Sequence, residues 1–84
     1  MKEVHLVYNS ISKNYIFYDG LEKSDKHRIN LGIYDTSGLI NELSHRLDLK
    51  RKTLLHAIDI PEDTLFILSN KLKGTKIRVV KETK

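Results

Sequence analysis

Cysteine is absent from the 84-residue sequence, which excludes a disulfide framework and thiolate metal sites. A domain this small must therefore depend on side-chain packing, helped by any self-association. Long hydrophobic runs are lacking as well, since no stretch approaches the roughly 18 apolar residues of a transmembrane helix. The first five residues also lack the basic-then-apolar layout of a signal peptide. We expect a non-exported, cytoplasmic protein with no membrane partner.

Aromatic residues account for only 7% of the chain, beside 39% hydrophobic and 31% charged residues. This balance is too apolar for a disordered tail and too polar for a membrane span. Proline occurs once and glycine four times, and no glycine belongs to a phosphate-cradling loop motif. Because a chain of this length builds one core, we expect a single domain over residues 1–84.

The net charge of +4 is unevenly distributed. Residues 1–35 contain five Lys or Arg and five Asp or Glu, whereas residues 36–84 contain ten and six, so the excess lies in the second part. It comes from two clusters, residues 50–52 and a tail with Lys71, Lys73, Lys76, Arg78, Lys81 and Lys84. The asymmetry predicts an electropositive face, and ordinary solubilising charge is the alternative.

The first part of the chain predicts strands. Residues 3–8 and 15–18 are rich in β-branched and aromatic types, and the polar stretch 9–14 between them has the length of a hairpin loop. In residues 27–34 an apolar face formed by alternate residues predicts a third strand, with Ile29, Leu31 and Ile33. A three-stranded antiparallel sheet is the simplest arrangement.

Helical periodicity begins after this sheet. Residues 35–37 offer N-capping side chains, and a stripe for one helix face follows, with Leu39, Ile40, Leu43 and Leu47. A second short stripe comes after Asp48, with Leu54, Leu55 and Ile58. Pro61 then starts a third helix that Gly74 can stop. The alternative is a strand at 65–69 paired with 76–80, and the agreement of start and stop signals favours the helix.

Residues 43–57 have the spacing of two short helices joined by a tight turn. Ser44 is small enough for close helix crossing, Asp48 suits the turn, and Leu54 and Ala57 would form the inner face of the second helix. On these residues the stretch 39–74 resembles the helix-turn-helix DNA-binding superfamily, and its last part resembles the helix that follows in phage-repressor-type members. The resemblance implies a groove-facing surface formed by Lys50, Arg51, Lys52 and His56.

The C-terminal segment predicts a strand that extends this surface. If Ile77 and Val79 pack on the sheet, Lys76 and Arg78 must point to the other face. An edge strand whose lysines discourage aggregation is the alternative. The candidate nucleic-acid-binding residues are Lys50, Arg51, Lys52, His56, Lys71, Lys73, Lys76 and Arg78.

Other chemistries have weaker support in the sequence. The four histidines lack close metal-ligand spacing, and no nucleophile motif joins a serine to a histidine and an aspartate. A small ribonuclease could use tyrosines with His45 and Arg46, whereas packing is the commoner role of tyrosine. On a sheet, Tyr8, Tyr15 and Phe17 could stack on single-stranded RNA. We expect no metal, cofactor or catalytic residue.

The sequence as a whole predicts an α+β domain: an N-terminal antiparallel sheet of about three strands, a helix-turn-helix-like pair and a C-terminal strand. The expected function is that of a small, basic, non-enzymatic and regulatory nucleic-acid-binding protein, acting on DNA or RNA. The alternative is a phage or mobile-element inhibitor or antitoxin that binds a target protein or ribonucleoprotein. Unpaired apolar surface would favour a homodimer.

Overall fold

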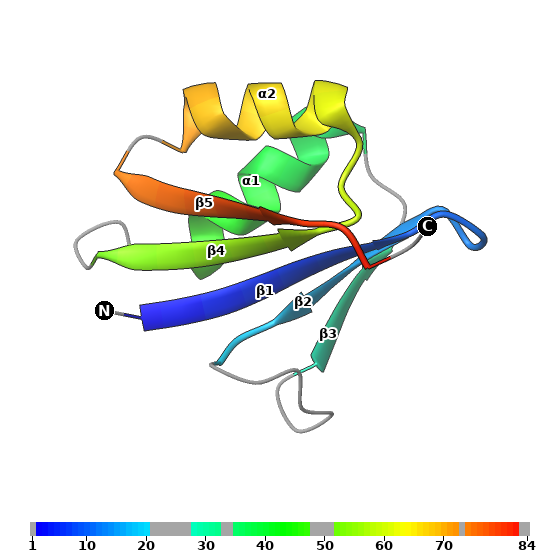
Figure 1. Ribbon diagram of the computed structural model, residues 1–84, viewed down its shortest axis with the longest axis horizontal. Coiled ribbons are helices and arrows are strands. Elements are labelled where there is room, and N and C mark those ends of the chain that lie inside the picture. The colour runs from blue at the N-terminus through cyan, green and yellow to red at the C-terminus, as the bar shows by residue number, and fades with distance from the viewer. Residues whose placement is uncertain (1, 21–27, 33–34, 48–51, 73, 83–84) are drawn as a thin grey trace.

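The computed structural model describes residues 2–20, 28–32, 35–47, 52–72 and 74–82 (Figure 1). Its elements, in chain order, are β1 (Lys2–Asn9), β2 (Asn14–Tyr18), β3 (Arg28–Gly32), α1 (Thr36–Arg46), β4 (Thr53–Ile58), α2 (Glu62–Lys71) and β5 (Thr75–Val80). The strands form one mixed sheet in the order β3-β2-β1-β4-β5. β1, β2 and β3 pair antiparallel, whereas β4 pairs parallel with both β1 and β5.

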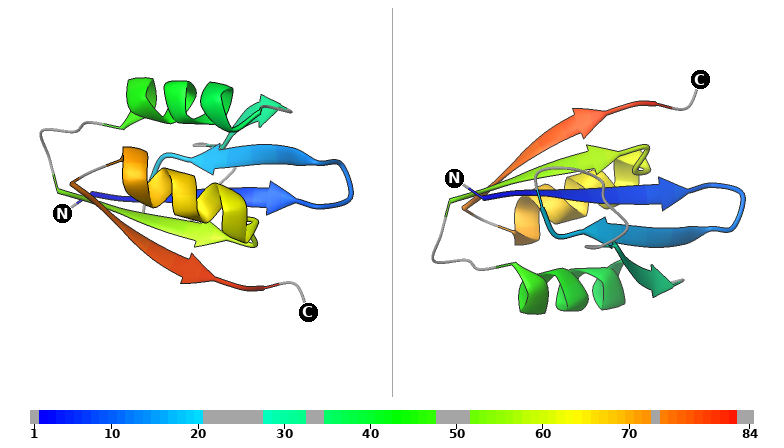
Figure 2. Two further views of the ribbon diagram at one scale, coloured as in Figure 1. Left: turned by 90° about the horizontal axis from the view of Figure 1, so that it is seen from above. Right: turned by 90° about the horizontal axis from the view of Figure 1, so that it is seen from below.

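Both helices cover the same face of this sheet (Figures 1 and 2). The parallel strands β1, β4 and β5 follow one another in the same direction across the sheet. Because connections between parallel strands are right-handed, α1 before β4 and α2 before β5 lie on the same side. Figure 2 shows α2 over β1 and β4, with β5 beyond it at the edge. The result is two layers, a helical layer and a sheet whose other face lies away from the helices.

The core lies between these layers. Alternate residues of β1 and β2 point into it, among them Val4, Leu6 and Phe17, and α1 contributes Leu39 and Leu43 from one face of the helix. Asp35 caps α1, because its Oδ1 accepts a hydrogen bond from the Gly38 N–H at 2.7 Å. The remaining members of the buried cluster are Tyr15, Leu31, Leu47, Leu55, Ala57, Ile60, Leu68 and Leu72.

The expected fold is wrong in the helix-turn-helix pair and in the number and pairing of the strands, whereas the expected C-terminal strand is present as β5. The α+β class holds, and β1, β2 and β3 form antiparallel strands, but the described chain forms a five-stranded mixed sheet with two helices rather than about three strands and a helix-turn-helix pair. The stretch predicted as a second helix is β4, which lies between β1 and β5. The resemblance to the helix-turn-helix superfamily therefore has no structural basis.

The physical reason lies in the burial of β4. Its residues are buried in all but one position, as in a strand covered on both faces, and such a strand reads as a short apolar run without period-two alternation. A run of this length cannot be distinguished from a buried helix turn by periodicity. The expected turn at Asp48 lies outside the described residues.

The third helix was predicted correctly, since Glu62–Lys71 forms α2 and the strand alternative at 65–69 is wrong. Proline has no N–H, and at the start of a helix this costs nothing because the first N–H groups have no partner within the helix. Pro61 precedes α2 at this position, and the acidic Glu62 and Asp63 lie at the positive end of the helix dipole. Neither α1 nor α2, the helices of the described chain, has the length and apolar character to cross a membrane.

Candidate nucleic-acid interface

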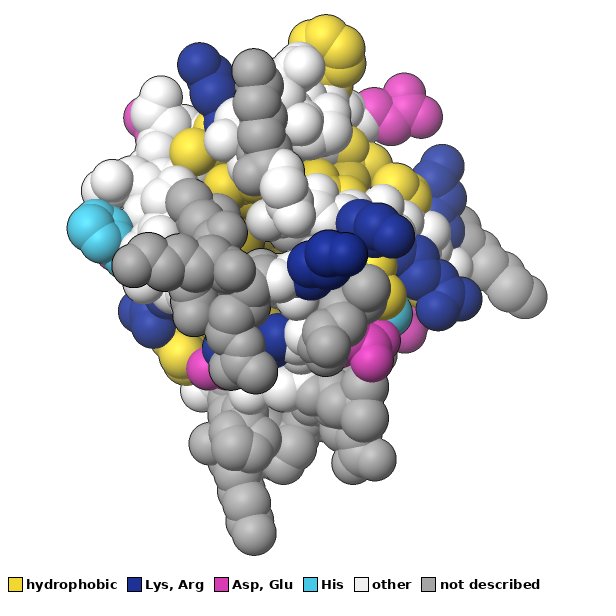
Figure 3. All heavy atoms as spheres, turned by 90° about the vertical axis from the view of Figure 1, so that its left-hand side faces the viewer, with side chains coloured by type: hydrophobic (Ala, Val, Ile, Leu, Met, Phe, Trp, Pro, Cys, Tyr) yellow, Lys and Arg dark blue, Asp and Glu magenta, His cyan; other side chains and the backbone are white. Residues whose placement is uncertain are grey.

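The topology gathers cationic residues at one end of the molecule. Parallel strands begin at the same edge, and each crossover helix ends where the next parallel strand begins. The Lys2 N–H donates to the Lys52 carbonyl at 3.0 Å, which brings the starts of β1 and β4 together. Lys71 ends α2, and Lys76 is near the start of β5. Figure 3 views this end of the molecule, where Lys and Arg side chains gather.

Some of these cations are neutralised by acidic neighbours. Lys2 Nζ lies 3.0 Å from Asp19 Oδ1, and Arg46 Nε lies 3.4 Å from Glu42 Oε2 one helical turn away. A different group has no ion pair or side-chain hydrogen bond among the described residues, and its members are exposed. We call this group the cationic surface; it consists of Lys52, Lys71, Lys76 and Arg78.

Two members of the cationic surface share one side of β5. Lys76 and Arg78 alternate with Ile77, whose side chain packs partly buried against the core. Lys76 lies beside Leu54 and Arg78 beside His56 on β4, which places both cations on the sheet face away from the helices. Val79 does not pack as expected, since 54% of its surface is exposed.

His56 lies beside this surface in a different role from the one expected. It is only 9% exposed, and its Nε2–H donates to Glu3 Oε1 at 2.9 Å. Its ring stacks on His5, with the centroids 4.5 Å apart, and the His5 Nδ1–H donates to the Gly20 carbonyl at 3.1 Å. The residue is therefore a largely buried member of a strand and not an exposed base-reading group of a helix.

The two imidazoles and Arg78 border a shallow hollow of about 280 Å³ on the same face. The hollow also contacts Glu82, so its lining carries charges of both signs. Lys52 and Lys71 do not border it. Phosphate contacts are therefore better provided by the exposed ends of Lys76 and Arg78 than by the histidines.

The structure separates the remaining candidate residues. Lys71 belongs to the helical layer, whereas Lys76 and Arg78 face the opposite side of the sheet. Lys50, Arg51 and Lys73 lie outside the described residues, so their place in the interface depends on the sequence alone.

The aromatic residues expected to stack on RNA, Tyr8, Tyr15 and Phe17, lie in the core or pack against it. Tyr15 and Phe17 are buried under the helices, and the Tyr8 ring lies 4.8 Å from that of Tyr15. The face away from the helices carries instead Tyr18 and His5, which are directly paired across β2 and β1. The sequence contained a signal for this pair. In β1, Glu3, His5 and Val7 alternate with buried residues, so their side chains lie on the opposite face of the strand.

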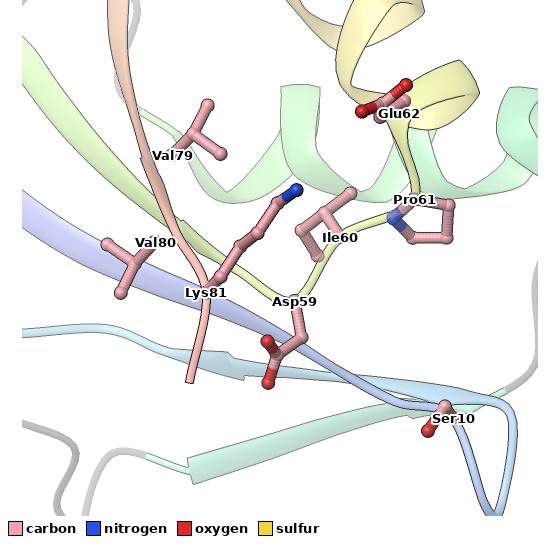
Figure 4. Close-up of a pocket in the computed structure, with 8 residues that line it drawn as sticks. All are labelled: Ser10, Asp59, Ile60, Pro61, Glu62, Val79, Val80 and Lys81. Carbon is pink, nitrogen blue, oxygen red and sulfur yellow. The ribbon is translucent and has the colours of Figure 1, made fainter. Parts of the chain in front are cut away.

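The opposite end of the sheet has a second hollow, of about 310 Å³, between β5 and the start of α2 (Figure 4). Asp59 lies there in the left-handed region at φ 56°, donates its N–H to the Val80 carbonyl and accepts from the Glu82 N–H at 2.9 Å. The lining residues are Ser10, Asp59, Ile60, Pro61, Glu62, Val79, Val80 and Lys81.

The described residues hold no group of three or more potential metal ligands. Comparison with family models, with curated proteins and with solved structures finds no match for this chain.

Proposed function

We propose that this protein binds nucleic acid through phosphate contacts made by its cationic surface. The observation that carries the proposal is that Lys52, Lys71 and Lys76 gather at one end of the sheet while Arg78 continues the row along β5, all exposed and without acidic partners among the described residues. A surface of unpaired Lys and Arg releases condensed counterions when it contacts a polyanion, which favours binding.

The geometry supports contact with a phosphate backbone rather than with base edges. Lys76 and Arg78 are two residues apart on one side of β5, a spacing of roughly 6.6 Å along the strand, so each can contact its own phosphate. The described residues form no recognition helix with a basic first turn, because the stretch expected to form it is β4. We therefore propose binding with little base specificity.

Three further cations join this proposal on sequence grounds. Lys50 and Arg51 directly precede Lys52, and Lys73 lies between Lys71 and Lys76. His56 contributes by engaging the Glu3 carboxylate, which lies on the same face of the sheet, in a hydrogen bond.

Anisotropy titrations with labelled single-stranded RNA, single-stranded DNA and duplex DNA test the proposal at several salt concentrations. We expect binding to every polyanion, with affinity that falls steeply as salt rises. The double variant Lys76→Ala/Arg78→Ala should bind more weakly than the matched variant Lys13→Ala/Arg28→Ala, which removes the same charge from exposed positions elsewhere.

Two results would contradict the proposal. Equal losses in the two double variants would show that net charge alone drives binding and that the cationic surface is not the site. Absence of binding to all three probes at low salt would remove the function itself.

A further inference from the structure

β5 is an edge strand with the features of a strand that can accept another one. It pairs with β4 alone, in regular parallel register over its whole length, and the described part of the chain places no strand on its outer side. It contains no proline and no bulge. Its outer backbone groups are therefore positioned to pair with an extended segment.

The backbone groups that point outward can be identified. The Val80 carbonyl accepts from the Asp59 N–H at 2.9 Å, so the Val80 peptide groups face β4. Because N–H and C=O groups alternate in direction along a strand, those of Arg78 also face β4, and those of Ile77 and Val79 face away from the sheet. An added strand would pair with these two residues.

The two flanks of this edge differ in chemistry. The flank away from the helices presents Lys76 and Arg78, which have no partners among the described residues. The helical flank presents the exposed side chain of Val79 above the hollow that Ile60 and Pro61 line (Figure 4). An incoming strand would thus meet Lys76 and Arg78 with one set of alternate side chains. The other set would meet Val79 and this hollow, which Glu62 and Lys81 also line.

Charge argues against a second copy of this chain as the occupant. Continuing one sheet through two copies of β5 would bring Lys76 and Arg78 of both copies onto the same face, and like charges on adjacent strands are destabilising. Acidic side chains at these positions would instead complement the cations.

We propose that the outer edge of β5 binds an extended segment of a partner protein in which acidic and apolar residues alternate. The acidic residues lie against Lys76 and Arg78, the apolar residues lie against Val79 and the hollow beside it, and the backbone pairs with Ile77 and Val79. This inference goes beyond nucleic-acid binding, because it uses main-chain groups that a phosphate backbone does not need.

A capped, fluorescent peptide of alternating glutamate and valine tests the proposal with the full chain. We expect it to bind, whereas a peptide of the same composition with the glutamates in one block should not. Val79→Pro removes an outward N–H without touching the β4 ladder, and should lower peptide affinity at least about tenfold while leaving nucleic-acid binding unchanged. Val79→Ala, which keeps the N–H, should lose less affinity than Val79→Pro.

Charge reversal gives an independent test that does not depend on tolerance of proline. Arg78→Glu should weaken binding of the alternating peptide at least about tenfold, whereas Arg28→Glu, on the opposite edge strand, should not. Circular dichroism spectra establish that each variant is folded.

Three outcomes would overturn the proposal. Equal affinity for the alternating and block peptides would leave only charge attraction. Lack of peptide binding by a protein that binds nucleic acid would overturn the edge site and leave the proposed function standing. A dimer in sedimentation that Val79→Pro dissolves would assign the edge to a second copy instead.

Discussion

The imidazole of His56 stacks on that of His5, with the ring centroids 4.5 Å apart and the planes inclined by 14°. The two residues lie directly opposite each other on the parallel strands β1 and β4. This contact joins two strands that are far apart in the sequence, so it links the N-terminal hairpin to the parallel half of the sheet.

We predict that His56→Ala destabilises the protein by roughly 1 to 3 kcal/mol. The substitution removes the ring stacking and the hydrogen bond to Glu3, whose carboxylate stays hydrated because it is partly exposed. Urea unfolding would measure the change in the free energy of unfolding. His45→Ala, at an exposed position of α1, is the control and should change that energy by no more than about 0.5 kcal/mol. Equal values for the two variants would contradict the stacking role.

A pair of leucine substitutions distinguishes the strand from the helix expected at β4. Leu55 is fully buried in the core, and Leu54 is half-buried on the opposite face of the strand. We predict that Leu55→Ala costs about 2 to 5 kcal/mol, and that Leu54→Ala costs less. In a helix-turn-helix the order is reversed, because Leu54 is on the inner face and Leu55 is exposed. Thermal or urea unfolding of both variants would measure it.

Local signals in the sequence account for the parts of the fold that were predicted. The polar stretch between β1 and β2 marks the hairpin, where the Asn9 side chain accepts from the N–H groups of Ile11 and Ser12. Asp35 marks the start of α1, and Pro61 marks that of α2. Each of these features depends on residues within a few positions of one another.

The parallel pairing of β4 has no comparable local signal. Its neighbours are β1 and β5, and its pairing with β1 joins residues 51 positions apart, well over half the length of the chain. The Lys and Arg cluster before β4 then favoured a recognition helix, although the same cations are equally compatible with the start of a buried strand. The alternation of Lys76 and Arg78 with Ile77 was a local signal, and the structure places these side chains on the faces that it indicates.

Asp59 provides a test of backbone strain at the end of β4. Its φ of 56° is unfavourable for a residue with a Cβ, and aspartate tolerates this region better than alanine does. We predict that Asp59→Ala destabilises more than Asp59→Gly by about 1 kcal/mol, although both lose the hydrogen bond to the Glu82 N–H. Calorimetric unfolding would measure the difference, and a glycine variant less stable than the alanine variant would contradict this account.

Edge protection by the β5 cations gives a separate prediction. Lys76→Ala/Arg78→Ala removes both charges from the exposed face of an edge strand, which should promote strand-to-strand association. Light scattering at increasing protein concentration should therefore show more association than for Lys13→Ala/Arg28→Ala. Aggregation together with unchanged nucleic-acid affinity would mean that these cations protect the edge and do not belong to the interface.

Salt titrations can count the phosphate contacts of individual cations. Each phosphate contact adds roughly 0.7 to 0.9 to the slope of log affinity against log salt concentration. We predict that Lys76→Ala lowers this slope by about that amount, because Lys76 is exposed on β5 and has no ion-pair partner among the described residues. Lys71→Ala should lower it as well, because the cationic surface includes this residue, and an unchanged slope would show that the ligand does not reach the helical layer. Lys2→Ala should leave the slope unchanged, since Asp19 already neutralises that ammonium group. A slope that falls equally in all three variants would show diffuse attraction to net charge and would contradict a bound path along β5.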